Sequence, residues 1–472
     1  MGLFGALYTG VAGLNAQSQA QSAISENVSN VNTVGYKKVE TNFSTLVVES
    51  TPRSYSPGGP FTSTNHRISE QGALQGTTSN TDIGISGNGF IVVNEAAVRG
   101  TTDEFFYTRA GKFTPDRDGY LRNTAGFYLQ GWALDSLGNK PTNSTSLISL
   151  TTVNVGNIPG TSIATTKADV EIQIPAKSPI DPVANPQVGF AVGSQQSSDI
   201  VVYDSLGIAQ SVRLIWTHVG TNAWNLTVNP GSYGNPPAPN KVINVLDNTG
   251  APLTTANKLG TPLVSGDQYL KVTFNNDGTL KDITNNSTGN SVYNNGDGTV
   301  KIRFDFSASG ANPQQDISFN FGPKNPTVPG ILKGLTQKDS DYSVVKLTQD
   351  GVPYGTYKGV TINEKGIVSG QFTNGLSQPL YQLPLATFAN PNGLTPETGN
   401  VYSQTREAGD LILRDAASGG SGKVLGATLE NSTVDIGTEF AKMIITQRAY
   451  NANTRVVSTS RDMLSELDRL VQ

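Results

Sequence analysis

The sequence contains no cysteine, and its 472 residues include only two histidines. Without cysteine the chain can form neither a disulfide nor a thiolate metal site. The histidines, His66 and His218, lie far apart in sequence, and neither has an evident acid or nucleophile partner, so both are predicted to be structural. No run of about 18 apolar residues occurs, and therefore no transmembrane helix is predicted.

Charge of either sign is also scarce. The 33 basic and 37 acidic side chains give a net charge of -4, which argues against a nucleic-acid binder that relies on a basic surface. The first residues lack the basic region and the cleavage site of a secretory signal peptide, so any export is expected to proceed without a cleaved leader. Glycine is abundant, with 51 residues, and this composition suits a β-rich protein with many turns.

Motifs that resemble catalytic or ligand-binding loops are incomplete. Residues 419–423 resemble a phosphate-binding loop, but Ala417 stands where its first glycine belongs, and Val424 replaces the hydroxyl residue. Asp116 and Asp118 resemble the start of a calcium loop that lacks its third ligand and its later glutamate. We therefore predict a protein that is not an enzyme and has no metal or cofactor.

Apolar spacing predicts one helix at each end of the chain. From Asp435 onward there is no proline, and apolar or small residues recur at steps of four and three. Ser432 or Thr433 is the expected N-cap of this helix. Residues 1–34 show matching spacing, although their glycines make that helix marginal on its own. The predicted interface residues of the terminal helices are Leu7, Val11, Leu14, Val28, Ile436, Phe440, Met443, Ile444, Tyr450, Val457, Leu464 and Leu467.

Three polar residues interrupt the C-terminal stripe, namely Gln447, Thr454 and Arg461. Such a polar stripe is weak for a self-sufficient coiled coil, so we expect the helix to need partners on more than one side. Because the two patterns lie at the two ends of the chain, the end helices are predicted to pair with each other and to support an assembly.

The sequence between the helices is typical of strands joined by tight turns. Residues 90–93 are a continuous apolar run after a glycine turn, and Asp277-Gly278 has the composition of a hairpin turn. We predict a mostly β fold with paired N- and C-terminal α-helices and nested β domains inserted between them. The predicted parts are a helical, coiled-coil-like domain from 1–34 and 430–472, an extended connector at 35–80, an inner β domain from 81–145 and 350–429, and one or two outer inserted β domains at 146–349.

Motifs at both ends of the chain carry a family resemblance. The N-terminal motif comprises Asn30, Asn32, Thr33, Gly35, Tyr36 and Lys37, and the C-terminal motif comprises Gln447, Arg448, Ala449 and Tyr450. Shorter matches lie at 87–90, 107–113, 118–121, 385–394 and 429–435. Together these segments resemble the family of bacterial flagellar rod and hook proteins, and the hook proteins in particular. Ser29 departs from the pattern, since this family more often has alanine there.

The resemblance implies a structural subunit of the flagellar hook. Such a subunit would be exported by the flagellar type III apparatus, without a cleaved signal peptide, to the extracellular flagellum. There it would form a homopolymer, a curved helical tube that acts as a universal joint coupling rod to filament. The implied partners are the rod, the hook–filament junction and hook cap proteins, and the export machinery. Neither nucleic-acid binding nor membrane insertion is implied.

Two alternatives remain open. A distal rod protein of the same family would share both ends, but the inserted segment of about 200 residues favours a hook protein because rod proteins are generally shorter. A secreted β-rich adhesin or carbohydrate-binding protein would explain the middle of the chain but not the paired terminal helices. An adhesin would need exposed aromatic side chains that converge on a cleft, for which Trp216 and Trp224 are candidates.

Overall fold

The structure, a computed structural model, covers most of the chain. The described residues are 2–45, 58–98, 100, 104–135, 137–156, 158–179, 195–230, 244–246, 270–285, 292–294, 297–326 and 333–471. Within them the fold is mostly β, with an N-terminal and a C-terminal helix packed together, as the sequence predicts. The chain divides into two compact units, of which unit 1 comprises residues 1–158, 357–371 and 377–472 and unit 2 comprises 159–356 and 372–376.

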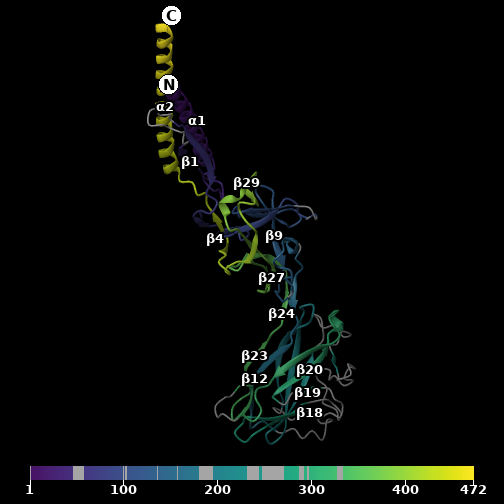
Figure 1. Cartoon of the computed structure of the whole chain (residues 1–472). Coiled ribbons are helices and arrows are strands. Elements are labelled where there is room, and N and C mark those ends of the chain that lie inside the picture. Colours follow the sequence, from purple (N-terminus) through teal and green to yellow (C-terminus); the bar gives the residue numbers. More distant parts are fainter. Residues whose placement is uncertain are drawn as a thin grey trace. The chain divides into compact units, whose positions relative to one another are not determined.

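The two helices belong to unit 1 and run antiparallel. Helix α1 spans Gly2–Ser29 and helix α2 spans Ile436–Val471. Figure 1 shows them side by side, with both chain termini at the same end of the pair. The N-cap of α2 is Asp435, whose side-chain oxygen accepts a hydrogen bond from the Thr438 amide at 2.7 Å. The prediction of Ser432 or Thr433 as N-cap is wrong, because Ser432 accepts a hydrogen bond from the Val434 amide and Thr433 accepts one from the Lys38 amide.

The main sheet of unit 1 has 13 strands and carries hydrophobic core on both faces. Adjacent side chains of β5 (Phe90–Asn94) point to opposite faces, so Ile91 and Val93 join one cluster while Phe90 and Val92 join another. The apolar run at 90–93 is thus a fully buried strand, as predicted. The other strands of unit 1 are β1 (Val39–Thr45), β2 (Pro60–His66), β3 (Leu74–Gly76), β4 (Ile83–Ser86), β6 (Phe105–Thr108), β7 (Phe113–Pro115), β8 (Leu121–Asn123), β9 (Tyr128–Ala133), β10 (Thr151–Thr152), β25 (Tyr357–Ile362), β26 (Ile367–Phe372), β27 (Ser377–Gln382), β28 (Pro384–Thr387), β29 (Thr395–Glu397), β30 (Val401–Ser403), β31 (Ile412–Asp415), β32 (Lys423–Gly426) and β33 (Thr428–Glu430).

The segment 35–80, for which we predict an extended connector, contains regular structure. Strands β1 and β2 pair antiparallel, with Val39 opposite His66 and Thr45 opposite Pro60. Strand β3 pairs with β33, the strand that leads toward α2. Residues 46–57 of this segment lie outside the described residues.

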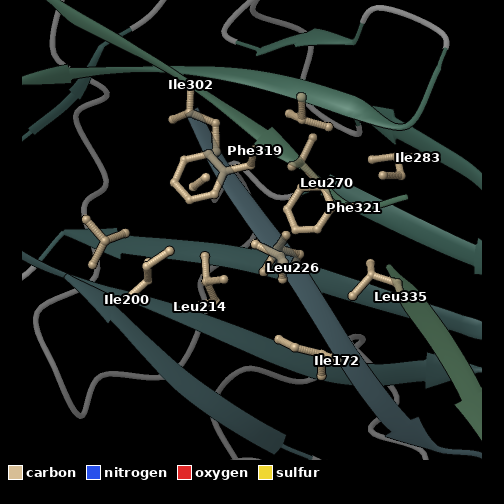
Figure 2. Packing of buried hydrophobic residues seen from close by; sticks show 14 of the residues in the cluster. Ile172, Ile200, Leu214, Leu226, Leu270, Ile283, Ile302, Phe319, Phe321 and Leu335 are labelled. Carbon is tan, nitrogen blue, oxygen red and sulfur yellow. The ribbon is translucent and has the colours of Figure 1, made fainter. Parts of the chain in front are cut away.

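Unit 2 is a sandwich of a five-stranded and a seven-stranded sheet over one hydrophobic core. Figure 2 shows Leu214 and Leu226 of the five-stranded sheet on one side of the core, with Phe319 of β21 (Gln315–Asn320) and Phe321, which directly follows β21, on the other. Asp277-Gly278 forms the predicted hairpin turn, with Gly278 at φ +83°. The strands of unit 2 are β11 (Thr161–Ile163), β12 (Lys167–Pro175), β13 (Gln195–Tyr203), β14 (Ala209–Gly220), β15 (Ala223–Pro230), β16 (Asn244–Leu246), β17 (Leu270–Phe274), β18 (Leu280–Asn285), β19 (Val292–Asn294), β20 (Thr299–Asp305), β21 (Gln315–Asn320), β22 (Leu335–Lys338), β23 (Ser343–Gln349) and β24 (Val352–Gly355).

Candidate assembly surface

The seam between α1 and α2 is lined by small side chains on α1. A Cβ atom added to Gly10 would lie 2.8 Å from Val457 Cγ2, and one added to Gly13 would lie 2.8 Å from the Asn453 amide. Glycine therefore allows a close backbone approach that larger residues would prevent. The residues of α1 that are buried along this seam are Gly10, Gly13, Ala16, Ala20, Ala23, Ile24 and Asn27.

The predicted interface residues of α1 lie beside this seam rather than in its centre. Leu7, Leu14 and Val28 are half-buried, and Val11 is 43% exposed. The reason is steric, because the leucine and valine side chains are too large for the narrow space that the glycines and alanines leave. Their lateral position leaves them available for contacts outside the chain, which stays a prediction.

On α2 the predicted interface residues divide into two groups. Met443, Val457 and Leu464 are half-buried and are spaced on the side that contacts α1. The other five residues are exposed, between 39% and 58%, although all are large and apolar or aromatic. These five are Ile436, Phe440, Ile444, Tyr450 and Leu467. A helix that leaves so much apolar surface in water is typical of a partner-binding element.

The N-terminal motif lies at the foot of the helical pair, directly after α1. Gly35, Tyr36 and Lys37 are buried, Asn30 and Thr33 are half-buried, and Asn32 is exposed. Gly35 has φ +68°, and a Cβ atom there would lie 2.6 Å from the backbone of Arg109. Only glycine fits this turn without strain, because the backbone is left-handed and the neighbouring strand is close.

Lys37 belongs to a buried ion cluster that joins three distant parts of the chain. Lys37 Nζ lies 2.5 Å from Glu430 Oε1, and Arg109 Nη1 lies 3.0 Å from Glu430 Oε2. All three side chains are at most 5% exposed. Lys37 also donates to the Glu70 carbonyl, and Arg109 donates to the Gly87 carbonyl. The cluster thus ties the segment after α1 and the segment before α2 to the main sheet.

The electrostatics of the cluster follow from its burial. Burial lowers the pKa of Lys37 below its ordinary value, although the Glu430 carboxylate pulls that pKa upward. Burial likewise lowers the pKa of Arg109, again against the pull of Glu430. Glu430 therefore pairs directly with both buried cations, and its loss would remove the ion pairs that the described residues show for Lys37 and Arg109.

A second buried network connects the two helices directly. The Asn27 side chain of α1 donates a hydrogen bond to Glu439 of α2 at 3.1 Å. It also donates to the Val39 carbonyl and accepts from the Val39 amide, both at 2.8 Å. The Tyr36 hydroxyl donates to Asn27 at 3.3 Å, and burial raises the pKa of Tyr36, so its phenol stays neutral. Glu439 also pairs with Lys442 at 2.8 Å. These contacts fix where α1 and α2 leave the β part of unit 1.

The C-terminal motif lies higher on α2 and is not brought to the N-terminal motif. Ala449 is half-buried, whereas Gln447, Arg448 and Tyr450 are exposed. Together with the exposed apolar side chains described above, these residues form part of the accessible surface of α2. Their role as a contact surface remains a prediction.

The aromatic and histidine candidates lie mostly in cores. Trp216 and Trp224 are fully buried in unit 2, so neither can stack on a bound carbohydrate. His218 is also buried, stacks on Trp224 with the ring centres 4.6 Å apart, and contacts the Ser178 carbonyl. His66 is half-buried in β2, where burial lowers its pKa. In the 419–423 loop, Lys423 forms an exposed ion pair with Glu364.

Within the described residues, no group of three or more histidine, aspartate or glutamate side chains is placed to hold a metal ion. None of the described helices is both long enough and apolar enough to cross a membrane.

The residues that sequence reasoning missed are the polar ones at the foot of the helices. Asn27 and Glu439 look like solvated helix positions in sequence, and Arg109 and Glu430 occur in recognisable motifs but without an assigned role. The available signal was their position, since Arg109 follows the apolar run at 105–107 and Glu430 lies just before the C-terminal helix.

Comparisons with known proteins cover both ends and the middle of the chain. Family profiles match as follows: flagella basal body rod protein at residues 7–37, flagellar hook protein FlgE/F/G D1 domain at 84–185, flagellar basal body protein FlaE D2 domain at 173–352, and flagellar basal body rod FlgEFG protein C-terminal at 426–470.

Individual relatives match over their full lengths. The flagellar hook protein FlgE of Caulobacter vibrioides is 32% identical, with 99% of each chain covered. That of Brucella suis is 30% identical, with 100% of each chain covered. The crystal structure of Helicobacter pylori flagellar hook protein FlgE2 aligns with a TM-score of 0.43 at 13% identity over 74% of this chain and 98% of that chain, which is too distant to support an argument.

Proposed function

This chain belongs to the flagellar hook protein FlgE family, whose members are structural and not enzymatic, and on that premise we propose that it is the subunit of a flagellar hook. Exported through the flagellar type III apparatus without cleavage, it polymerises outside the cell into a curved tube. The tube is a universal joint that couples rod to filament. Its partners are further copies of the chain, the rod, the junction and cap proteins, and the export machinery.

The observation that supports this proposal best is the pair of terminal helices with apolar side chains left in water. Ile436, Phe440 and Ile444 are each about half exposed along one side of α2, while α1 occupies a different side. Neighbouring copies would cover this surface, and heterologous contacts of that kind generate a helical polymer when they do not close into a ring.

The ion cluster gives the helical pair a fixed base. Because Lys37, Arg109 and Glu430 are buried together, the two helices are anchored to the main sheet through charge-assisted hydrogen bonds on both sides. We propose that this base transmits torque, while bending of the tube is accommodated by sliding contacts between the polar β surfaces of neighbouring copies.

Electron microscopy of the purified chain, seeded with short hook fragments, tests the function. Seeding removes the requirement for a nucleating partner, so the result reports on polymerisation alone. We expect curved tubes that extend from the seeds. Straight tubes would favour a distal rod protein, and seeds that fail to grow at any protein concentration would contradict the proposal.

A further inference from the structure

A small groove opens where α1, α2 and β1 meet. It has a volume of about 170 Å³. One wall is apolar and includes Ala20 and Ile24 of α1, Phe43 of β1 and Ile445 of α2, while Glu40, Glu439 and Lys442 also line the groove. Phe43 is 50% exposed and Ile445 is 67% exposed, so the apolar wall of the groove is open to water. For scale, a buried apolar cavity of about 150 Å³ holds a benzene molecule.

The first turns of α1 present aromatic side chains to solvent. Phe4 is 69% exposed, Tyr8 is 65% exposed and Val11 is 43% exposed, and their spacing places them on one face of the helix. Within Gly2–Ser29 the single charged side chain is Glu26, so this tip approaches another surface without like-charge repulsion. We call Phe4, Tyr8 and Val11 the tip stripe.

We propose that the groove receives the Phe4 side chain of a second copy of this chain, with Tyr8 covering its rim. This inference rests on the proposed polymer. The groove is continuous with the α1–α2 seam, because Ala20, Ala23 and Ile24 line both. A docked ring therefore extends packing that already exists within the chain, and the groove has the volume for one aromatic ring.

The occupant must come from another copy. Phe4 and Ile24 lie twenty residues apart on the same helix, which separates them by about 30 Å at a rise of about 1.5 Å per residue. A chain cannot fill its own groove with its own tip. Every added copy then offers one free tip and one free groove, and such a head-to-tail contact builds an open polymer when the rotation between copies does not close a ring.

The cysteine-free sequence makes a direct test simple. The variant Phe4→Cys/Ile445→Cys carries one thiol on the tip stripe and one on the groove. The matched control, Phe4→Cys/Ile444→Cys, moves the second thiol by about 100° around α2. Both variants are grown from the same seeds, oxidised as tubes and resolved on denaturing gels.

We expect the groove variant to give a ladder of cross-linked copies and the control to remain mostly uncross-linked. The reverse result would show that the tip packs on the Ile444 side and would overturn the inference while leaving the polymer intact. Tubes without cross-links in either variant would also overturn it. A wild-type chain that fails to grow from seeds would instead contradict the proposed function, and the inference with it.

A second measurement uses no cysteine. Replacing the ring with Phe4→Ala should raise the critical concentration for growth by about tenfold or more, as expected for a buried aromatic anchor. Leu137→Ala removes a side chain that is 83% exposed elsewhere in unit 1 and serves as the control. An equal, small change in both variants would count against the groove.

Discussion

Removing the carboxylate of Glu430 should strongly destabilise the base of the helical pair. In Glu430→Gln the buried cations Lys37 and Arg109 lose their shared anion, while no water can reach them easily. Breaking a buried ion pair by removing one partner costs about 3–5 kcal/mol of unfolding free energy. Lys37 can avoid being a buried unpaired cation by releasing its proton. For a lysine with its ordinary pKa, this deprotonation costs about 4–5 kcal/mol at pH 7, which limits the penalty that Lys37 can contribute. We therefore expect Glu430→Gln to lose about 4 kcal/mol of unfolding free energy.

The sharper expectation concerns the double variant. Adding Lys37→Met to Glu430→Gln removes one of the unpaired cations, so the double variant should be more stable than Glu430→Gln alone. The exposed pair Lys423–Glu364 supplies a control, because Glu364→Gln should cost at most about 1 kcal/mol.

Urea unfolding followed by circular dichroism at the helix band suits this test. Both helices belong to unit 1, and the described part of unit 2 contains no α-helix, so the helix signal reports on unit 1. If Glu430→Gln lost less than about 1 kcal/mol, or if the two substitutions simply added, the reasoning about the buried cations would be refuted.

Three further predictions follow from the seam, the turn after α1 and the acidic groups of unit 2. Gly10→Leu should prevent close helix pairing and tube growth, because even a Cβ atom there would lie 2.8 Å from Val457, and the thermal unfolding of the helix signal should shift downward. Gly35→Ala should destabilise unit 1 more than Gly420→Ala in urea unfolding, because both have positive φ but only Gly35 faces close backbone. Hydrogen bonding from Arg303 holds the pKa of Asp316 below its ordinary value. The Asp316 carboxylate therefore stabilises unit 2 above about pH 4, and this stabilisation is lost as the pH falls through the folded-state pKa. Urea midpoints of unit 2 should therefore drop on acidification less in Asp316→Asn than in the wild type.

The pairing of the end helices could be predicted from sequence because matching periodic patterns at both termini flank β-type sequence. The contact face could not be derived in the same way. Glycine and alanine contribute little to an apolar stripe, yet Gly10, Gly13 and Ala16 form the seam because they let the backbones approach. The larger residues that dominate the pattern, such as Phe440 and Ile444, remain on the outside.

The ion cluster was beyond sequence reasoning for a different reason. Lys37 and Glu430 are 393 positions apart, and Arg109 and Glu430 are 321 positions apart, so no local spacing connects them. Their burial follows from the fold of the whole of unit 1, which brings β33 beside the segment after α1. By contrast, the hairpin at Gly278 depends on adjacent residues, and its position could be predicted directly.

The most direct measurement compares seeded growth of the full chain with that of a chain limited to residues 35–434. The shorter chain lacks α1 and α2 but retains the β part of unit 1 and all of unit 2. We expect curved tubes from the full chain and no growth from the shorter one, because the unpartnered apolar faces of the helices would be gone. Tubes of equal length from both chains would contradict the claim that the terminal helices build the polymer.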